Sequence, residues 1–258
     1  MRVAVDGVYF SWGRSADELV ELVAATGADG ANWQLAEGFA EPTNPGTWDM
    51  CGEMLGRNAI SVVTLAAGSQ NSCLVGEEDA FRLEVEQGIE AAKVLGCGII
   101  DCWPRMSEGA TKPESQAVLA SNLRAIAPRL ELAGMLISFE FEPDVTIERY
   151  GESLEFLEDL PTCARLTADT YHIQRAGDGL AASATAMADR LGVLHISGSH
   201  RGEPGSDGDE CDHEAFVRAA REAGFDGDLV IQYQPPDDPL ESLKRSVELC
   251  TDIIAKTD

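Results

Sequence analysis

The sequence predicts an α/β protein of the (β/α)8 TIM-barrel class, and three observations support this prediction. Short apolar runs rich in β-branched residues alternate with longer stretches of helical periodicity, which is typical of parallel α/β architectures. Eight runs of each kind occur. The chain has 258 residues, which is close to the roughly 250 residues usual for one such barrel. We therefore predict a single barrel domain over residues 1–258.

The predicted strands are short and end in polar residues or turns. They cover Val3–Asp6, Gly30–Gln34, Ser61–Ala66, Gly98–Trp103, Leu136–Phe141, Arg165–Asp169, Val193–Ser197 and Leu229–Tyr233.

A predicted helix follows each strand. In the clearest one, Ser15–Thr26, Ser15 and Glu18 have the spacing of a capping box, and Gly27 supplies a left-handed C-cap. The other predicted helices are Thr47–Arg57, Glu77–Leu95, Pro113–Ala133, Glu152–Leu160, Gly179–Leu191, Asp212–Ala223 and Pro239–Lys256.

The chain is strongly acidic, with 45 Asp and Glu residues against 19 Lys and Arg, a formal charge of -26. Such a surface repels phosphate backbones and anionic lipids, so we expect neither nucleic acid nor membrane as a partner. Seven scattered cysteines without C-x-x-C spacing, and an N-terminus without an apolar leader, predict reduced thiols in a cytoplasmic protein.

Metal-ligand side chains recur at the carboxyl ends of the later strands. Glu140 lies near the end of the fifth, Asp169 ends the sixth with His172 just after it, and His195 lies on the seventh. In a barrel, these ends share one mouth. Mixed carboxylate and imidazole ligands suit Mn²⁺, Mg²⁺, Zn²⁺ or Co²⁺, and the mixture does not choose among them. Such a cation would polarise a carbonyl group and stabilise an enediolate.

Glu142 is an alternative to Glu140. Side chains alternate along a strand, so both carboxylates are expected to face the same way. We favour Glu140 as the ligand and interpret Glu142 as a carboxylate at the rim, before Pro143.

These motifs resemble the xylose-isomerase-like superfamily of sugar phosphate isomerases, ketose epimerases and endonuclease-IV-type barrels. The carrying motifs are Glu-Phe-x-Pro from Glu140, Asp-x-x-His from Asp169 and a histidine six residues before Arg201. The resemblance runs along essentially the whole chain. It implies that Glu140 is both a metal ligand and the acid/base, that Asp169 and His195 are ligands, and that His172 and Arg201 bind substrate oxygens.

The fourth ligand in those relatives is a glutamate, where this chain has Gln232. An amide offers a carbonyl oxygen to a metal but does not shuttle a proton. This departure weakens a two-glutamate epimerisation and leaves an isomerisation, dehydration or β-elimination that uses Glu140 and a second group. Candidates for that second catalytic group are His172, His200 and Glu142.

Further residues are predicted at the mouth as substrate contacts. Trp12 and Trp103 offer flat rings for sugar faces, with buried packing as the alternative, which also applies to Trp33. Gln34 stands where relatives often have a glutamate. His200 and Glu142 complete the predicted substrate-binding set.

The resulting hypothesis is a metal-dependent isomerase or epimerase acting on a small sugar, polyol or keto-sugar next to a carbonyl. A lyase, dehydratase or deglycosidase on the same scaffold, and a catalytically silent sugar-binding protein, are the alternatives. An endonuclease is disfavoured because it needs more histidine ligands and would meet an acidic surface. The resemblance also implies a homodimer or homotetramer.

Overall fold

Eight parallel strands close into a barrel in the computed structural model, which describes residues 1–69 and 71–257. Neighbours in sequence pair with one another, and the last strand pairs with the first. The predicted fold class is thereby confirmed, while the assignment of the whole chain to one domain stays a prediction. The strands are β1 (Val3–Asp6), β2 (Gly30–Gln34), β3 (Ser61–Ala66), β4 (Ile99–Cys102), β5 (Leu136–Glu140), β6 (Ala164–Asp169), β7 (Leu191–Ile196) and β8 (Leu229–Ile231).

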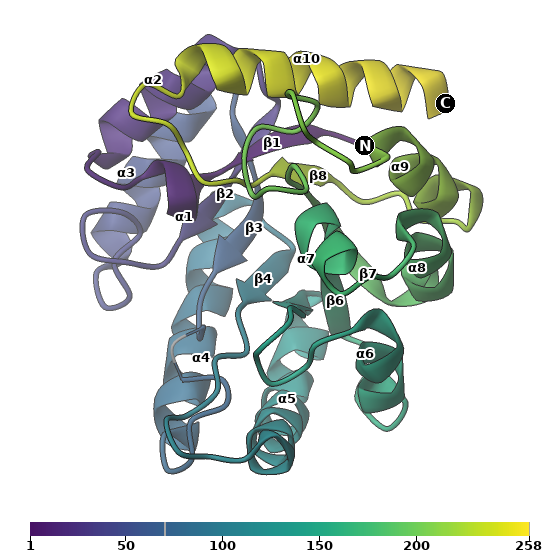
Figure 1. Ribbon diagram of the computed structural model, residues 1–258. Coiled ribbons are helices and arrows are strands. Elements are labelled where there is room, and N and C mark those ends of the chain that lie inside the picture. Colours follow the sequence, from purple (N-terminus) through teal and green to yellow (C-terminus); the bar gives the residue numbers. More distant parts are fainter. Residues whose placement is uncertain (70, 258) are drawn as a thin grey trace.

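The helices lie outside the barrel and cover its strands (Figure 1). They are α2 (Ala16–Thr26), α3 (Pro45–Arg57), α4 (Glu78–Leu95), α5 (Lys112–Ala133), α6 (Tyr150–Leu157), α8 (Leu180–Met187), α9 (His213–Glu222) and α10 (Leu240–Thr257). The capping box at Ser15 and the left-handed Gly27 are both present, as predicted. Within the described residues, no helix combines the length and the apolar character needed to cross a bilayer.

Two short helices were not predicted, α1 (Gly7–Phe10) and α7 (Thr170–Arg175). Each starts directly after a strand, and a carboxylate at the strand end accepts a hydrogen bond from the new turn: Asp6 caps α1 and Asp169 caps α7. A turn of this length is too short to show a 3.6-residue period.

Two predicted boundaries were wrong in ways that matter for the site. The predicted helix Gly179–Leu191 ends at Met187, continues as a 3-10 turn, and gives Leu191 to β7. The predicted last strand ends at Ile231, so Gln232 lies just beyond it. The boundary was predicted too late because Tyr233 is fully buried, like a strand residue, although it does not belong to β8.

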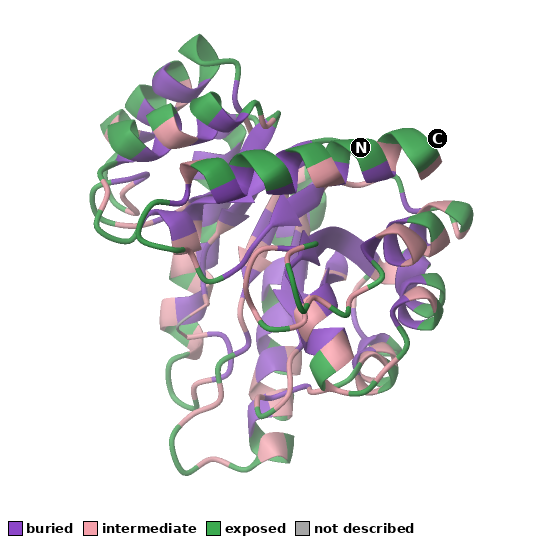
Figure 2. Ribbon diagram, turned by 45° about the horizontal axis from the view of Figure 1, so that its top comes forward, coloured by how far each residue is buried: buried purple, intermediate pink, exposed green. Residues whose placement is uncertain are grey.

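An apolar layer inside the barrel forms the floor of the site. Ala4, Val63, Val193 and Val230 are buried together as a cluster of their own, which is the layered filling expected of such barrels. The larger core lies between strands and helices, and Figure 2 shows buried strands inside a shell of helices whose outer faces are exposed. Because side chains alternate, the next inward position on each strand lies above this floor.

We expect Gly7→Ala to lower the free energy of unfolding by about 1–3 kcal/mol or more. A Cβ at Gly7 would lie 2.1 Å from the carbonyl oxygen of Asn32, so β1 and β2 would have to separate. Urea unfolding followed by circular dichroism measures the loss.

Gly56→Ala is the matched control, because its Cβ would meet no atom within 4 Å in helix α3. It should leave stability unchanged or raise it by up to about 1 kcal/mol. Equal effects of the two substitutions would contradict the steric argument.

Candidate functional site

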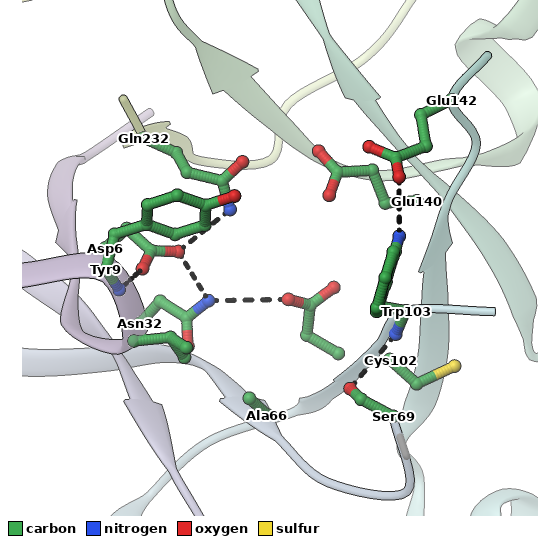
Figure 3. A pocket seen from close by; sticks show the side chains of 12 residues that line it. Asp6, Tyr9, Asn32, Ala66, Ser69, Cys102, Trp103, Glu140, Glu142 and Gln232 are labelled. Carbon is green, nitrogen blue, oxygen red and sulfur yellow. Dashed lines mark hydrogen bonds between the residues drawn. The ribbon is translucent and has the colours of Figure 1, made fainter. Parts of the chain in front are cut away.

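A polar pocket of about 230 Å³ opens at the carboxyl ends of the strands. This volume is below the roughly 300–1,000 Å³ of drug-sized ligand sites, which favours a small substrate. Figure 3 shows side chains from opposite sides of the barrel converging on it. Its lining includes Asp6, Tyr9, Asn32, Asp101, Trp103, Glu140, Glu142 and Gln232.

Glu140 contacts two imidazoles at this pocket. It is the last residue of β5 and only 8% exposed. Its Oε1 lies 3.2 Å from Nδ1 of His195 and 3.9 Å from Nε2 of His172. Burial alone would lower the pKa of His195, but the hydrogen bond and the charge of Glu140 raise that pKa to about 9. The negative carboxylate of Glu140 and the protonated imidazole of His195 therefore stabilise each other.

Arg201 connects two of the predicted metal ligands. Its guanidinium pairs with the fully buried carboxylate of Asp169 and donates a 2.8 Å hydrogen bond to Oε1 of Gln232. Burial would raise the pKa of Asp169, but the charges of Arg201, His172 and His195 and the hydrogen bond from Arg201 together lower that pKa. Arg201 adopts φ 61°, a left-handed conformation that is uncommon outside glycine. The β7–α9 loop thus holds the arginine over the site in a strained backbone.

Glu140, Asp169 and His172 offer ligand atoms that lie within 4.8 Å of one another. Two carboxylates and an imidazole fit a divalent cation. His195 touches Glu140 but lies outside this group, and its Nε2 is buried without a hydrogen-bond partner among the described residues. The roles of His195 and Gln232 as ligands stay predictions.

Glu142 lies two residues beyond the end of β5 and forms part of the pocket wall. Oε2 of Glu142 lies 2.9 Å from Nε2 of His172, and Oε1 accepts a 3.1 Å hydrogen bond from Nε1 of Trp103. Burial lowers the pKa of His172, but the bond to Glu142 and the nearby charges produce a net rise. Glu142 therefore fixes the orientation of two side chains that were predicted to contact substrate.

Some predicted substrate contacts lie away from the pocket. Trp12 is 64% exposed and stacks on Tyr9. His200 is exposed and lies 3.3 Å from the Ser206 hydroxyl, in a separate surface depression. Gln34 donates to the hydroxyl of Ser11 and is not among the lining residues.

Three polar residues on strands of the first half of the chain line the pocket and were missed, Asp6, Asn32 and Asp101. Asp6 is fully buried and accepts hydrogen bonds from Tyr9 N, Asn32 Nδ2 and Gln232 Nε2 at 2.7, 3.2 and 3.1 Å. Asn32 also donates to Asp101 at 3.4 Å. The available signal was a polar residue inside each of three predicted strands. Asp6, Asn32 and Asp101 do not belong to the motifs that predicted the site residues of the later strands.

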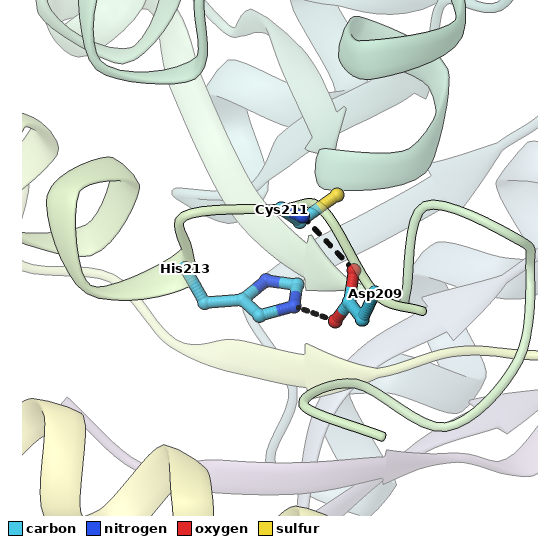
Figure 4. A group of neighbouring side chains, drawn as sticks. All are labelled: Asp209, Cys211 and His213. Atoms are coloured by element: carbon cyan, nitrogen blue, oxygen red, sulfur yellow. Dashed lines mark hydrogen bonds and ion pairs between the residues drawn. The ribbon is translucent and has the colours of Figure 1, made fainter. Parts of the chain in front are cut away.

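A second group of ligand-type side chains, Asp209, Cys211 and His213, lies in the β7–α9 loop and at the start of α9 (Figure 4). The Asp209 carboxylate is already engaged by His213 and by the backbone N–H groups of Ser199, Gly205 and Cys211. Burial raises the pKa of the Cys211 thiol to about 12, which keeps it protonated. This group therefore acts as a latch for the loop that carries Arg201.

The fold and the site together define a (β/α)8 protein with an acid/base pocket at the carboxyl ends of its strands. The family model for the xylose isomerase-like TIM barrel matches residues 20–253, and the chain belongs to this family. The predicted resemblance is confirmed.

Named relatives agree with this membership. Hydroxypyruvate isomerase of Escherichia coli (strain K12) is 29% identical over 66% of this chain and 69% of its own length. L-ribulose 3-epimerase of Methylomonas sp. (strain DH-1) is 30% identical over 53% and 48%. These homologues support isomerase or epimerase activity, as predicted.

Solved structures share the fold. An IolI protein with a bound zinc atom has a TM-score of 0.82 at 18% identity, covering 100% of this chain and 99% of that one. The 3-keto-D-glucoside 4-epimerase YcjR of Escherichia coli has a TM-score of 0.81 at 18% identity, covering 98% and 99%.

Asp209→Asn should lower the free energy of unfolding at pH 7 by about 1–3 kcal/mol, because a buried charged acceptor is lost. The bond to His213 and the backbone N–H groups outweigh burial and hold the folded-state pKa of Asp209 below its usual value. Its stabilisation is therefore complete above the unfolded pKa of about 3.9 and is lost as the pH falls further. Urea titrations from pH 7 to pH 3 measure the difference, which should shrink below about pH 4.

Asp207→Asn is the control, since Asp207 is exposed on the same loop and should change stability by less than about 0.5 kcal/mol. A loss for Asp209→Asn that stayed constant down to pH 3 would rule out the latch as described.

Gln232→Glu should destabilise the metal-free protein at pH 7 by about 1–3 kcal/mol. The amide nitrogen that donates to Asp6 would become a carboxylate oxygen facing another carboxylate. Urea unfolding in EDTA gives the value. Gln234→Glu makes the same change at an exposed position two residues on, and it should be nearly neutral; equal losses would exclude the amide's role.

Proposed function

We propose that the protein is a metal-dependent isomerase that moves a carbonyl group between neighbouring carbons of a small hydroxy-carbonyl substrate of the sugar or hydroxypyruvate type. The observation that carries this proposal is the placement of Glu140, a pocket carboxylate hydrogen-bonded to one imidazole and close to a second. The small pocket and the isomerase and epimerase relatives support it.

The role of each residue in this proposal follows from its position in the site. Glu140 accepts the proton from the carbon next to the carbonyl, and His195 holds that carboxylate in place. His172 and Arg201 bind and orient substrate oxygens. Glu140, Asp169 and His172 would hold the cation, with His195 and Gln232 as further candidate ligands. When bound, Mn²⁺, Mg²⁺, Zn²⁺ or Co²⁺ would polarise the carbonyl group.

The hydrogen bonds of Gln232 favour isomerisation over two-base epimerisation. Its oxygen accepts from Arg201 and its nitrogen donates to Asp6, so both ends of the amide are engaged. An amide has no proton to exchange at neutral pH. Isomerisation needs only one carbon base, because the same carboxylate returns the proton to the adjacent carbon on the same face.

Location and assembly belong to the same proposal. The free cysteines of the described residues fit the reducing cytoplasm, where we infer that the enzyme works. A homodimer or homotetramer stays a prediction.

Glu140→Gln should reduce turnover by about 10²–10⁴-fold, since the amide does not accept the carbon-bound proton. Hydroxypyruvate and small ketoses are incubated with enzyme in D₂O, and NMR follows both deuterium at carbon and product. Mass spectrometry should find about one divalent ion per chain, and EDTA should abolish turnover until the ion is restored.

Glu155→Gln is the matched control, because Glu155 is exposed on α6 and should leave turnover unchanged. A metal-loaded wild type that neither exchanges nor converts any of these compounds would refute the isomerase. Loss of water or of a leaving group would instead identify a lyase.

A further inference from the structure

Asp101 is a pocket carboxylate to which neither the family motifs nor the relatives assign a role. It is the third residue of β4, and its side chain lines the pocket together with Glu140. Oδ1 accepts a 3.0 Å hydrogen bond from the Thr167 hydroxyl, and Oδ2 accepts a 3.4 Å bond from Asn32. Both donors are uncharged, so the carboxyl group is positioned without a direct ion pair to either.

The other candidates for a second proton-transfer group are engaged or distant. Gln232 is an amide held at both ends. Asp6 is completely buried and accepts three hydrogen bonds. Glu142 accepts a hydrogen bond from Trp103 and lies 2.9 Å from Nε2 of His172, so that imidazole is engaged as well. His172 also belongs to the candidate cation group, and His200 lies outside the pocket. Asp101 remains: it is a residue of intermediate burial, and it lines the pocket.

We propose that Asp101 is the second proton-transfer group of the pocket and moves the proton between the two substrate oxygens while Glu140 moves the one between the carbons. The inference rests on the proposed isomerase function and adds a residue and a division of roles to it.

The surroundings of Asp101 suit a group that must both give and take a proton. Burial raises its pKa to about 6; the charge of His195 opposes the rise, and the charges of Glu140 and Asp6 add to it. A carboxyl group poised near neutral pH is populated in both protonation states, which is what acid/base catalysis requires.

The reaction balances with these two groups. Glu140 takes the proton from the hydroxyl-bearing carbon, the C–H electron pair forms a carbon–carbon double bond, and the carbonyl electron pair moves to its oxygen. That oxygen takes the proton of Asp101, which leaves an enediol. The neighbouring hydroxyl then returns a proton to Asp101 as its oxygen becomes the new carbonyl, and Glu140 gives its proton to the former carbonyl carbon.

The test compares two rates in metal-loaded wild type, Asp101→Asn and Glu140→Gln, with hydroxypyruvate in D₂O as the probe. Asp101→Asn should lose product formation by about 10²–10⁴-fold while it still exchanges the carbon-bound proton of the substrate for deuterium. Glu140→Gln should lose both. A structural role of Asp101 would instead lower both rates together, or neither.

Asp101→Ala provides a second test that does not depend on the asparagine variant. It leaves space where the carboxyl group was, so added formate should restore product formation to Asp101→Ala and not to Asp101→Asn. Asp228→Asn is the matched control, because Asp228 accepts bonds from Arg2 just before β8, at the opposite end of the barrel. It should leave both rates unchanged.

The outcomes separate this inference from the proposed function. Folded Asp101 variants with wild-type product formation would overturn the inference and leave the isomerase intact. Variants without product, without exchange and without formate rescue would also overturn it. A wild type that neither exchanges nor converts the probe or the small ketoses would overturn both.

Discussion

The site depends on the alternation of side chains along strands that are closed into a barrel. Ala4, Val193 and Val230 point inward and form part of the apolar floor. Two residues further along the chain lie Asp6 on β1, His195 on β7 and Gln232 just after β8. Because the period of a strand is two, the register that buries the floor also directs these polar groups to the pocket. A one-residue slip in β1, β7 or β8 would remove the floor and the site together.

Gln232 has a structural reason to be an amide. It must accept a hydrogen bond from Arg201 on one side and donate one to Asp6 on the other, and among neutral side chains of this length only an amide does both. A glutamate would satisfy Arg201 and repel Asp6. Glutamine rather than the family's glutamate is therefore needed at this position because Asp6 is a carboxylate that requires a donor. Since the amide does not transfer protons, other groups in the pocket must do so.

Local patterns predicted most of the fold, because strands and long helices have sequence periods of their own. The turns α1 and α7 were missed since they are held by Asp6 and Asp169 from preceding strands. The later half of the site was predicted from short motifs. The group of Asp6, Asn32 and Asp101 was not, because it exists only when β1, β2 and β4 meet. Trp12 and His200 do not line the pocket, since nearness to a strand end does not fix where a loop side chain points.

The concentration of charge at the pocket connects stability to function. The charges of Glu140 and Asp6 raise the pKa of Asp101, the charge of Glu140 raises the pKa of Asp6, and the charge of His195 offsets part of both rises. Arg201 pairs directly with Asp169. Burying several carboxylates opposes folding unless a cation is supplied. A divalent ion bound only by the folded chain would shift the folding equilibrium toward it. Burial, together with this repulsion, raises the pKa of Asp101 to about 6, so a feature that is unfavourable for folding is favourable for proton transfer.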